Sequence, residues 1–259
     1  MTNTGAGLPI CIKHTNLRRI SMIEVKPTFM DKTKNVRNFT VMMDGLALGR
    51  GEGRMGLVYG QAGRGKTRTT DWYHAHNGGV FLRMLTVWRT SELEFLKGLC
   101  RELGVLSPPG RKGPAFAAAV DALLADPKPV FLDELEKLPG YFLDVVRDLS
   151  DLSTAPVILI GEEELVSYMR VNRRVWSRTH QAIEFAPMSK PDIISYFAQA
   201  AALTVNADVV DVFYRAADGD FRIVKRGLIS LAQIANAKQT RNITPEMARI
   251  ALETGLKGN

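Results

Sequence analysis

Short apolar runs alternate with amphipathic segments over the first two thirds of the chain. Buried strands are predicted at residues 55–59, 79–85, 130–132 and 156–160, and helices at 67–75, 92–103, 116–124 and 141–152. Ser91 is a favourable N-cap for the helix over 92–103, where leucines recur at helical spacing. Strands that alternate with helices of this length predict an α/β fold, with a parallel sheet covered by helices on both faces.

The pattern changes after Pro187, where strands give way to helices. Ser189 and Pro191 open one predicted helix, and further helices are predicted at 207–217, 221–237 and 245–255. We therefore expect an α/β domain over residues 46–187 and a small all-helical domain over residues 188–259. Residues 1–45 are expected to form a basic N-terminal extension, with one strand near 20–25 and one helix near 33–48.

Composition and charge narrow the class of protein. Hydrophobic residues make up 46% of the chain and charged residues 24%, as in ordinary globular proteins. No apolar run approaches the ~20 residues that a membrane helix needs, so no membrane partner is expected. Residues 1–16 lack the apolar core of a secretory signal, and two cysteines are too few for a disulfide framework, which favours the cytoplasm.

The net charge of +7 is unevenly distributed along the chain. Residues 1–70 contain 12 Lys and Arg against 4 Asp and Glu. This excess favours a polyanionic partner, most plausibly nucleic acid, and leaves a basic surface that serves only solubility as the alternative.

A phosphate-binding loop is predicted between the strand over 55–59 and the helix that follows. Gly60-Gln61-Ala62-Gly63-Arg64-Gly65-Lys66-Thr67 matches G-x-x-x-x-G-K-[ST], the Walker A pattern. Backbone N–H groups of such a loop, together with the start of the next helix, bind phosphate oxygens. Lys66 is expected to reach the β- and γ-phosphates and the Thr67 hydroxyl to ligate Mg²⁺, and we include the adjacent Arg68 among the nucleotide-binding residues.

Two carboxylates, Asp133 and Glu134, directly follow the apolar strand over 130–132. Asp133 is expected to hold Mg²⁺ through its water shell, as a Walker B aspartate does, and Glu134 to deprotonate the attacking water. Glu136 is expected at the surface. The strand over 156–160 leads to Gly161-Glu162, where the carboxylate of Glu162 could touch the γ-phosphate or that water.

Arginines cluster before the end of the predicted α/β domain, at positions 170, 173, 174 and 178. One of them is expected to act as a finger on the γ-phosphate of a neighbouring subunit. Arg178 is preferred, Arg173 and Arg174 stay open, and a solvated basic helix is the alternative. Arg222, at the start of a C-terminal helix, is expected to fold back onto the nucleotide, with a surface position as the alternative.

In their order along the chain, these motifs resemble those of AAA+ ATPases, which are P-loop NTPases with a helical lid domain. The finer resemblance, over about residues 50–235, is to transposition regulators of the MuB and TnsC type. It is carried by Tyr59–Thr67, Phe81–Thr90, Leu132–Leu138, Val146–Leu149 with Ile160-Gly161, and Ser177–Ser189. Glu162 departs from the family, where Thr or Asn commonly follows this glycine. About 50 residues precede the core, which is too few for the N-terminal DNA-binding domain of larger family members.

The resemblance implies an ATPase that binds ATP at subunit interfaces and assembles as a filament or ring around duplex DNA. Such a protein selects target DNA, activates a transposase and disassembles on hydrolysis, here in the cytoplasm of a bacterial host at its nucleoid. Contacts with DNA are expected mostly to phosphates. The resemblance places DNA-contacting residues at Arg83, Arg89 and Thr90, and Arg18 and Arg19 are further candidates within the extension.

Three other functions remain open on these motifs. A helicase loader or replication initiator would bind a helicase. A nucleotide-switched signalling ATPase would have no affinity for DNA, which an electrophoretic shift at moderate salt decides. A metabolic kinase is disfavoured, because a helical lid and an arginine cluster have no use there.

Overall fold

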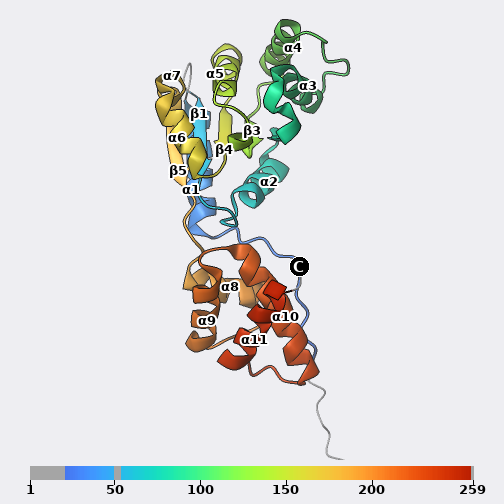
Figure 1. Ribbon diagram of the computed structural model, residues 1–259, viewed down its shortest axis with the longest axis vertical. Coiled ribbons are helices and arrows are strands. Elements are labelled where there is room, and N and C mark those ends of the chain that lie inside the picture. The colour runs from blue at the N-terminus through green and yellow to red at the C-terminus, as the bar shows by residue number, and fades with distance from the viewer. Residues whose placement is uncertain (1–20, 50–53, 258–259) are drawn as a thin grey trace, which may run out of the picture.

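The computed structural model describes residues 21–49 and 54–257, which form an α/β part and a helical part (Figure 1). The α/β part contains, in chain order, α1 (Lys34–Leu48), β1 (Met55–Tyr59), α2 (Lys66–Asn77), β2 (Val80–Arg83), the 3-10 helix η1 (Thr86–Thr90), α3 (Glu92–Glu102), α4 (Lys112–Ala125), β3 (Val130–Asp133), the 3-10 helix η2 (Leu135–Lys137), α5 (Phe142–Ser153), β4 (Val157–Ile160), α6 (Glu163–Val171), α7 (Arg173–Trp176) and β5 (Thr179–Glu184). The helical part contains α8 (Lys190–Ala201), α9 (Ala207–Ala217), α10 (Phe221–Ala237) and α11 (Pro245–Lys257).

The five strands form one parallel sheet in the order β2-β3-β4-β1-β5. Strands β3 and β4 are buried along their whole length, which explains their continuous apolar sequences. Because all strands run the same way, the loops after β1, β2 and β3 emerge at the same edge of the sheet. Ligands of open α/β sheets bind at this carboxyl edge.

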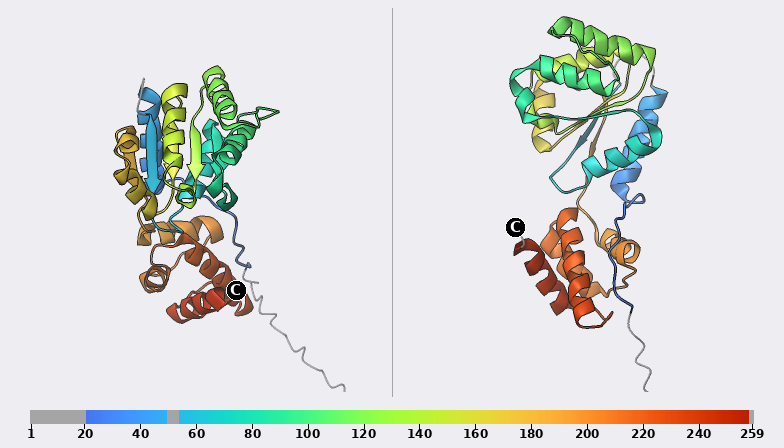
Figure 2. Two further views of the ribbon diagram at one scale, coloured as in Figure 1. Left: turned by 45° about the horizontal axis from the view of Figure 1, so that its top comes forward. Right: turned by 90° about the vertical axis from the view of Figure 1, so that its right-hand side faces the viewer.

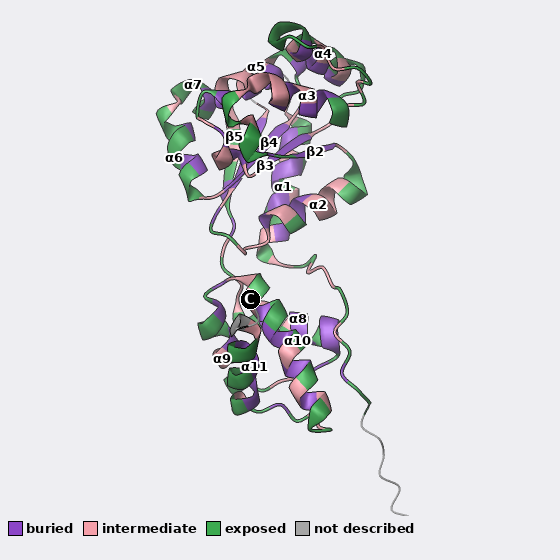
Figure 3. Cartoon of the chain, turned by 45° about the vertical axis from the view of Figure 1, so that its right-hand side comes forward, coloured by how far each residue is buried: buried purple, intermediate pink, exposed green. Residues whose placement is uncertain are grey.

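Helices cover both faces of the sheet, as the sequence predicts. One face packs against α3 to α7 through side chains such as Leu57, Leu132 and Leu159, and the opposite face packs against α1 and α2 through Val58 and Ile158. Successive strand residues point to opposite faces, so neighbouring residues of β1 serve different cores. Figure 3 shows the buried sides of the helices turned toward the sheet.

The helical part has a core of its own, built from α8 to α11. Phe197, Phe213 and Leu231 lie at its centre. Ser189 caps α8 in a capping box, because its side chain accepts from the backbone N–H of Asp192 while the Asp192 carboxylate accepts from the backbone N–H of Ser189. The predicted helix starts in this part of the chain are therefore confirmed. None of the helices within the described ranges is long and apolar enough to cross a membrane.

Residues 21–33, which we call the N-terminal strap, differ from the prediction. The structure has no strand here; the strap is an extended segment that runs along the helical part to α1 (Figure 2). Its backbone bonds to helices instead of to a neighbouring strand: the Ile23 N–H donates to Asn236 Oδ1 (2.7 Å) and the Lys26 N–H to the Ala200 carbonyl (2.7 Å). Ile23 is buried in the helical core, while α1 packs on the sheet, so the domain boundary predicted at residue 45 falls inside α1.

Two further elements depart from the sequence pattern. Strand β5 was missed because it lies at the sheet edge, where its residues alternate in exposure and form no continuous apolar run. Helix α4 begins at Lys112, four residues before the predicted start, although Pro114 follows. Pro114 stands in the first helical turn, where the missing N–H would have no partner in any case.

Candidate nucleotide-binding site

The loop between β1 and α2 is held against both the sheet and the helical part. Gly60 and Gly63 have φ angles of +139° and +79°, in the region that favours glycine. A Cβ atom on Gly60 would lie 3.0 Å from the Phe185 carbonyl oxygen, and one on Gly63 would lie 2.1 Å from Oδ1 of Asp220. Glycine is therefore required at both positions by backbone angle and by close approach.

Lys66 begins α2 and turns its side chain back into the loop. It is 9% exposed, and its Nζ donates to the carbonyl oxygens of Gly60 (2.5 Å) and Gln61 (3.0 Å). Burial lowers the pKa of Lys66, and the carboxylates of Glu162, Glu136 and Asp133 oppose this effect. If phosphate groups bind in the loop, their oxygens would replace these carbonyl partners of the ammonium group.

Thr67 and Asp133 meet across the carboxyl edge of the sheet. The Thr67 hydroxyl donates to Oδ2 of Asp133 (2.8 Å), and Asp133 itself is 2% exposed. Burial raises the pKa of Asp133, while hydrogen bonds from Thr67 and from the Glu134 N–H lower it. Two oxygen atoms this close suit a hard cation such as Mg²⁺, which takes few protein ligands and keeps several waters and phosphate oxygens. The donor set therefore fits the metal that the sequence predicts.

Glu134 follows β3 in a left-handed conformation (φ +58°, ψ +39°). Arg83 at the end of β2 pairs with its Oε1 and Lys137 pairs with its Oε2. The strand register aligns Arg83 with Asp133, which brings Arg83 to the neighbouring Glu134. Arg83, followed by Lys137, lowers the pKa of Glu134 to about 2, so the side chain is fully ionised at neutral pH.

Glu136 is half-buried inside the site, which corrects the expectation of a surface position. Its Oε2 accepts from the backbone N–H of Glu162 (3.3 Å), and a Cβ atom on Gly161 would lie 2.3 Å from it. Burial raises the pKa of Glu136. The 3-10 turn of η2 brings Glu136, three residues after Asp133, back to the same side of the chain. Glu136 and Glu162 therefore gather with Asp133 around Lys66.

The helical part contacts the phosphate-binding loop directly. The Phe221 N–H at the start of α10 donates to the Gly63 carbonyl (3.1 Å), and Asp220 caps the helix by accepting from the N–H of Arg222 (2.7 Å). Arg222 is exposed and close enough to Lys66 to lower the pKa of that lysine. The structure thus brings Arg222 to the site from the helical part.

Arg64 points away from the centre of the loop, a role that the loop pattern did not reveal. Its guanidinium donates to the Phe185 carbonyl (3.2 Å) and to Gln61 Oε1 (2.7 Å), and pairs with Glu184 (3.6 Å). Residues 184 and 185 lead from β5 to the helical part. Arg64 therefore ties the phosphate-binding loop to the connection between the two parts.

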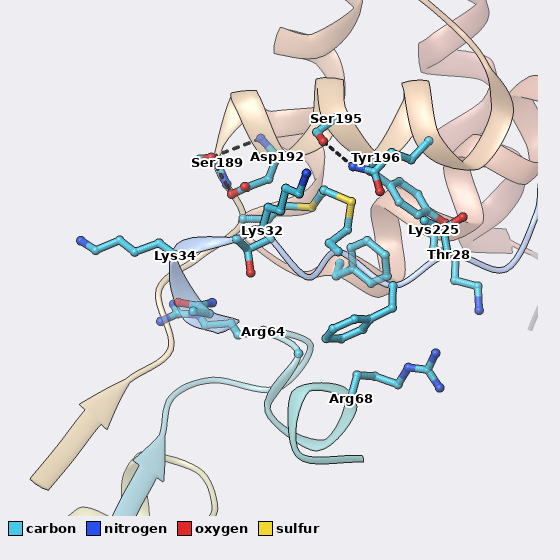
Figure 4. Close-up of a pocket in the computed structure, with 18 of the residues that line it drawn as sticks. Thr28, Lys32, Lys34, Arg64, Arg68, Ser189, Asp192, Ser195, Tyr196 and Lys225 are labelled. Atoms are coloured by element: carbon cyan, nitrogen blue, oxygen red, sulfur yellow. Dashed lines mark hydrogen bonds between the residues drawn. The ribbon is translucent and has the colours of Figure 1, made fainter. Parts of the chain in front are cut away.

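A cavity of about 730 Å³ adjoins the loop, between the N-terminal strap, α8 and the start of α10 (Figure 4). Its apolar lining includes Phe29, Tyr196 and Phe221. Basic side chains surround it, contributed by Lys26, Lys32, Lys34, Arg37, Arg64, Arg68 and Lys225, against the single carboxylate of Asp192. Its volume lies in the range of ~300–1,000 Å³ typical of small-molecule sites.

Arg178 lies at the opposite edge of the sheet from the phosphate-binding loop. Its carbonyl accepts from the N–H of Met55 (3.2 Å), at the start of β1, whereas the loop follows the end of that strand. Its Nε contacts Oδ2 of Asp151 (3.2 Å). Arg178 therefore cannot reach the loop of its own chain. Arg173 and Arg174 are exposed at α7, also outside the loop.

The residues expected to contact DNA divide into three groups. Arg89 and Thr90 are exposed on η1, which follows β2 at the carboxyl edge, and the Tyr141 hydroxyl donates to the Arg89 carbonyl (3.0 Å). Arg83 pairs with Glu134, so the structure brings it into the nucleotide site. Arg18 and Arg19 lie outside the described residues. Trp88 is half-buried and packs edge-on against Phe95 (ring centroids 6.4 Å apart).

Comparison with known proteins identifies sequence relatives. Residues 50–169 match the AAA domain family. The chain is 28% identical over 194 residues to the ATP-dependent target DNA activator B of Escherichia phage Mu, covering 71% of this chain and 61% of that protein. It is 24% identical over 165 residues to the Mu-like prophage FluMu DNA transposition protein B of Haemophilus influenzae, covering 61% and 57%. The chain thus spans about three fifths of the length of these relatives.

Solved structures share the fold at lower identity. The ORC2 protein of Aeropyrum pernix matches with a TM-score of 0.64 and 16% identity over 95% of this chain and 73% of that one. The RuvB Holliday junction branch migration motor of Thermotoga maritima matches with a TM-score of 0.58 and 14% identity over 88% and 72%. The chain therefore has the AAA+ fold of P-loop NTPases, and the relatives that its sequence resembles are a DNA transposition protein B and an ATP-dependent target DNA activator B.

Proposed function

We propose that this chain is an ATP-dependent, DNA-binding ATPase that regulates transposition. It assembles on duplex DNA as a filament or ring, selects target DNA and activates a transposase. The observation that carries the ATPase activity is the convergence of Lys66, Thr67, Asp133 and Glu134 at one edge of the sheet. The transposition role is supported by the relative named DNA transposition protein B, and the action on target DNA by relatives named ATP-dependent target DNA activator B.

Each residue of the site has a separate role in ATP hydrolysis. The loop N–H groups and Lys66 bind the β- and γ-phosphates, and Thr67 and Asp133 would hold Mg²⁺. When bound, Mg²⁺ neutralises charge on the phosphate oxygens. Glu134 accepts the proton of the attacking water. Arg222 reaches the phosphates from the helical part, which we call the lid. Arg178 acts on the nucleotide of a neighbouring subunit.

The cavity beside the loop accommodates the rest of the nucleotide. Apolar side chains from the strap and lid enclose a space that suits an adenine ring, and the adjoining loop takes the phosphates. Because the cavity lies between the strap, α8 and α10, a bound nucleotide contacts both parts of the chain. Hydrolysis changes those contacts, which gives the assembly a way to disassemble.

Electron microscopy of the protein with duplex DNA tests this proposal. Filaments or rings on DNA are expected with a slowly hydrolysed ATP analogue, and bare DNA is expected with ADP. ATP binding without any DNA binding would contradict the proposal and support a nucleotide-switched signalling protein. Recruitment of a replicative helicase, without an effect on a transposase, would support a helicase loader.

A further inference from the structure

Residues 185–189, which we call the hinge segment, connect β5 to α8 and are held by side chains from distant parts of the chain. Asn35, in the first turn of α1, donates from Nδ2 to the Ala186 carbonyl (2.9 Å) and accepts at Oδ1 from the Ala186 N–H (3.0 Å). Arg64 of the phosphate-binding loop donates to the Phe185 carbonyl (3.2 Å). The hinge segment is therefore tied both to the phosphate-binding loop and to the helix that follows the N-terminal strap.

We propose that Asn35 and Arg64 are positioning residues that hold the hinge segment, and through it the lid, in the orientation that ATP binding requires. The inference rests on the proposed function, because it takes the loop and the adjoining cavity as the ATP site. It gives a role in nucleotide binding to Asn35, which belongs to none of the motifs of the sequence. It also makes α1 a third element of the ATP site, beside the loop and the lid.

The contact of Asn35 takes the place of a neighbouring strand. Strand β5 lies at the edge of the sheet, and its pairing with β1 ends at Phe185, whose N–H donates to the Tyr59 carbonyl (2.8 Å). At the next residue, the carboxamide of Asn35 offers Ala186 both a donor and an acceptor, as a strand would. Both hydrogen bonds are partly buried. Without Asn35, both backbone groups of Ala186 therefore lose their partner where water has limited access.

The contacts of Arg64 leave one of its donors unused. The side chain is 11% exposed, and its terminal nitrogens contact Phe185, Gln61 and Glu184. Its Nε is buried without a hydrogen-bond partner among the residues that the structure describes. A buried donor without a partner costs free energy of folding, so stability alone does not account for an arginine at this position. The link that its guanidinium makes between the loop and the hinge segment does account for it.

The hinge segment carries the parts of the lid that face the cavity. It leads directly into α8, which contributes Tyr196 to the cavity lining. It also packs on the start of α10: the Met188 N–H donates to the Gly219 carbonyl (3.4 Å), and a Cβ atom on Gly219 would overlap Pro187. Arg222 follows in the first turn of α10. A displaced hinge segment would therefore move the cavity wall and Arg222 together, while the metal ligands stay in place on the sheet.

A purely structural role of these contacts is the competing interpretation. It predicts that substitutions lower the stability of the fold and weaken every ligand of the site alike. Positioning of the lid predicts a selective loss instead, because ATP occupies both the loop and the cavity, whereas inorganic pyrophosphate occupies only the loop. The ratio of the affinities for these two ligands therefore distinguishes the two interpretations.

Isothermal titration calorimetry with Mg²⁺ and either a slowly hydrolysed ATP analogue or pyrophosphate measures this ratio. Asn35→Ala removes both hydrogen bonds to Ala186. We expect it to weaken binding of the ATP analogue about tenfold, since two partly buried hydrogen bonds are lost, and binding of pyrophosphate less than about twofold. Asn38→Ala is the matched control, because Asn38 lies one turn further along α1 and is exposed. It should bind both ligands as the parent chain does.

Arg64→Lys tests the second contact at constant charge. Lysine keeps the positive charge of the loop but lacks the paired donors of the guanidinium, so we expect the same selective loss, of about threefold to tenfold. If circular dichroism finds Asn35→Ala unfolded, Arg64→Lys carries the test.

A selective loss of affinity for the ATP analogue in both variants, and not in Asn38→Ala, supports the proposal. Equal losses for the two ligands, or parent affinities for both, in the folded variants would overturn it and leave the proposed function standing. A selective loss in only one variant would overturn the role of the other residue. A parent chain that binds neither ligand would contradict the proposed function itself.

Discussion

At the scale of single residues, Glu134, the proposed general base, is expected to be needed for ATP turnover and not for ATP binding. Glutamine keeps the shape of its side chain but accepts no proton, so we expect Glu134→Gln to bind ATP with near-parent affinity while kcat falls by about 10²–10⁴-fold. A calorimetric titration with ATP and a steady-state phosphate assay measure the two quantities. The expected product is an ATP-bound assembly that no longer disassembles.

Glu136→Gln is the matched control for this variant. Glu136 lies two residues away and is also half-buried, but its Oε2 is engaged by the N–H of Glu162 and faces Gly161. We expect Glu136→Gln to lower kcat by less than about tenfold, because Glu136 acts on Lys66 only through its charge. If Glu134→Gln hydrolysed ATP at the parent rate and Glu136→Gln did not, the role of base would pass to Glu136.

The chemistry of the loop is predictable from the sequence because its residues are contiguous. Lys66 and Thr67 are fixed by the strand before them and the helix after them. The pairing of Arg83 with Glu134 is not predictable in this way, since the two residues are 51 positions apart. Only the alignment of β2 with β3 brings Arg83 and Glu134 together, and the register of two parallel strands cannot be predicted from the sequence of either strand alone.

At the scale of elements, the N-terminal strap shows where the hydrophobic pattern fails to predict secondary structure. The strands and helices with clear apolar patterns were predicted to within a few residues. The strand was predicted from apolar residues at 20, 22, 23 and 25, yet the hydrogen-bond partners of the strap are helices that follow more than 150 residues later. Its conformation depends on that tertiary packing, which local sequence does not encode.

The strap is expected to be a structural component of the lid. Ile23 is 5% exposed within the lid core, and replacing it with alanine removes buried surface and leaves a cavity. We expect Ile23→Ala to lower the free energy of unfolding by about 2–4 kcal/mol. Urea denaturation monitored by circular dichroism measures this change.

Met22→Ala is the matched control, because the adjacent Met22 is 78% exposed. Its effect is expected to stay within about 0.5 kcal/mol. Equal effects of the two substitutions would contradict the packing of the strap. A loss confined to Ile23→Ala would establish that residues in the basic extension are needed to stabilise the lid.

At the scale of the whole molecule, the nucleotide site joins the two parts of the chain through three connections. Arg64 ties the loop to residues 184 and 185, Gly63 accepts from Phe221 of the lid, and the strap runs from the lid core to α1. Phe29 of the strap also stacks on Trp72 of α2 (ring centroids 5.1 Å apart). We therefore expect a nucleotide bound in the cavity to affect the orientation of the lid through several contacts.

In the proposed assembly, DNA binding is expected to depend on a charge that each subunit repeats. Arg89 is exposed on η1 at the carboxyl edge of the sheet, and its carbonyl is held by Tyr141. We expect Arg89→Ala to weaken DNA binding severely and to flatten its salt dependence, since the slope of log affinity against log salt falls by about 0.9 for every phosphate that is no longer neutralised. ATP binding should stay near the parent value, because Arg89 is not among the residues of the nucleotide site.

Lys128→Ala is the control for this variant. Lys128 pairs with Asp126 just before β3, at the amino edge of the sheet, and its removal should leave the slope unchanged. Fluorescence anisotropy with labelled duplex DNA over a series of salt concentrations measures both slopes. Identical slopes for the parent and Arg89→Ala would exclude Arg89 as a phosphate-binding residue and direct the search to Lys13, Arg18 and Arg19.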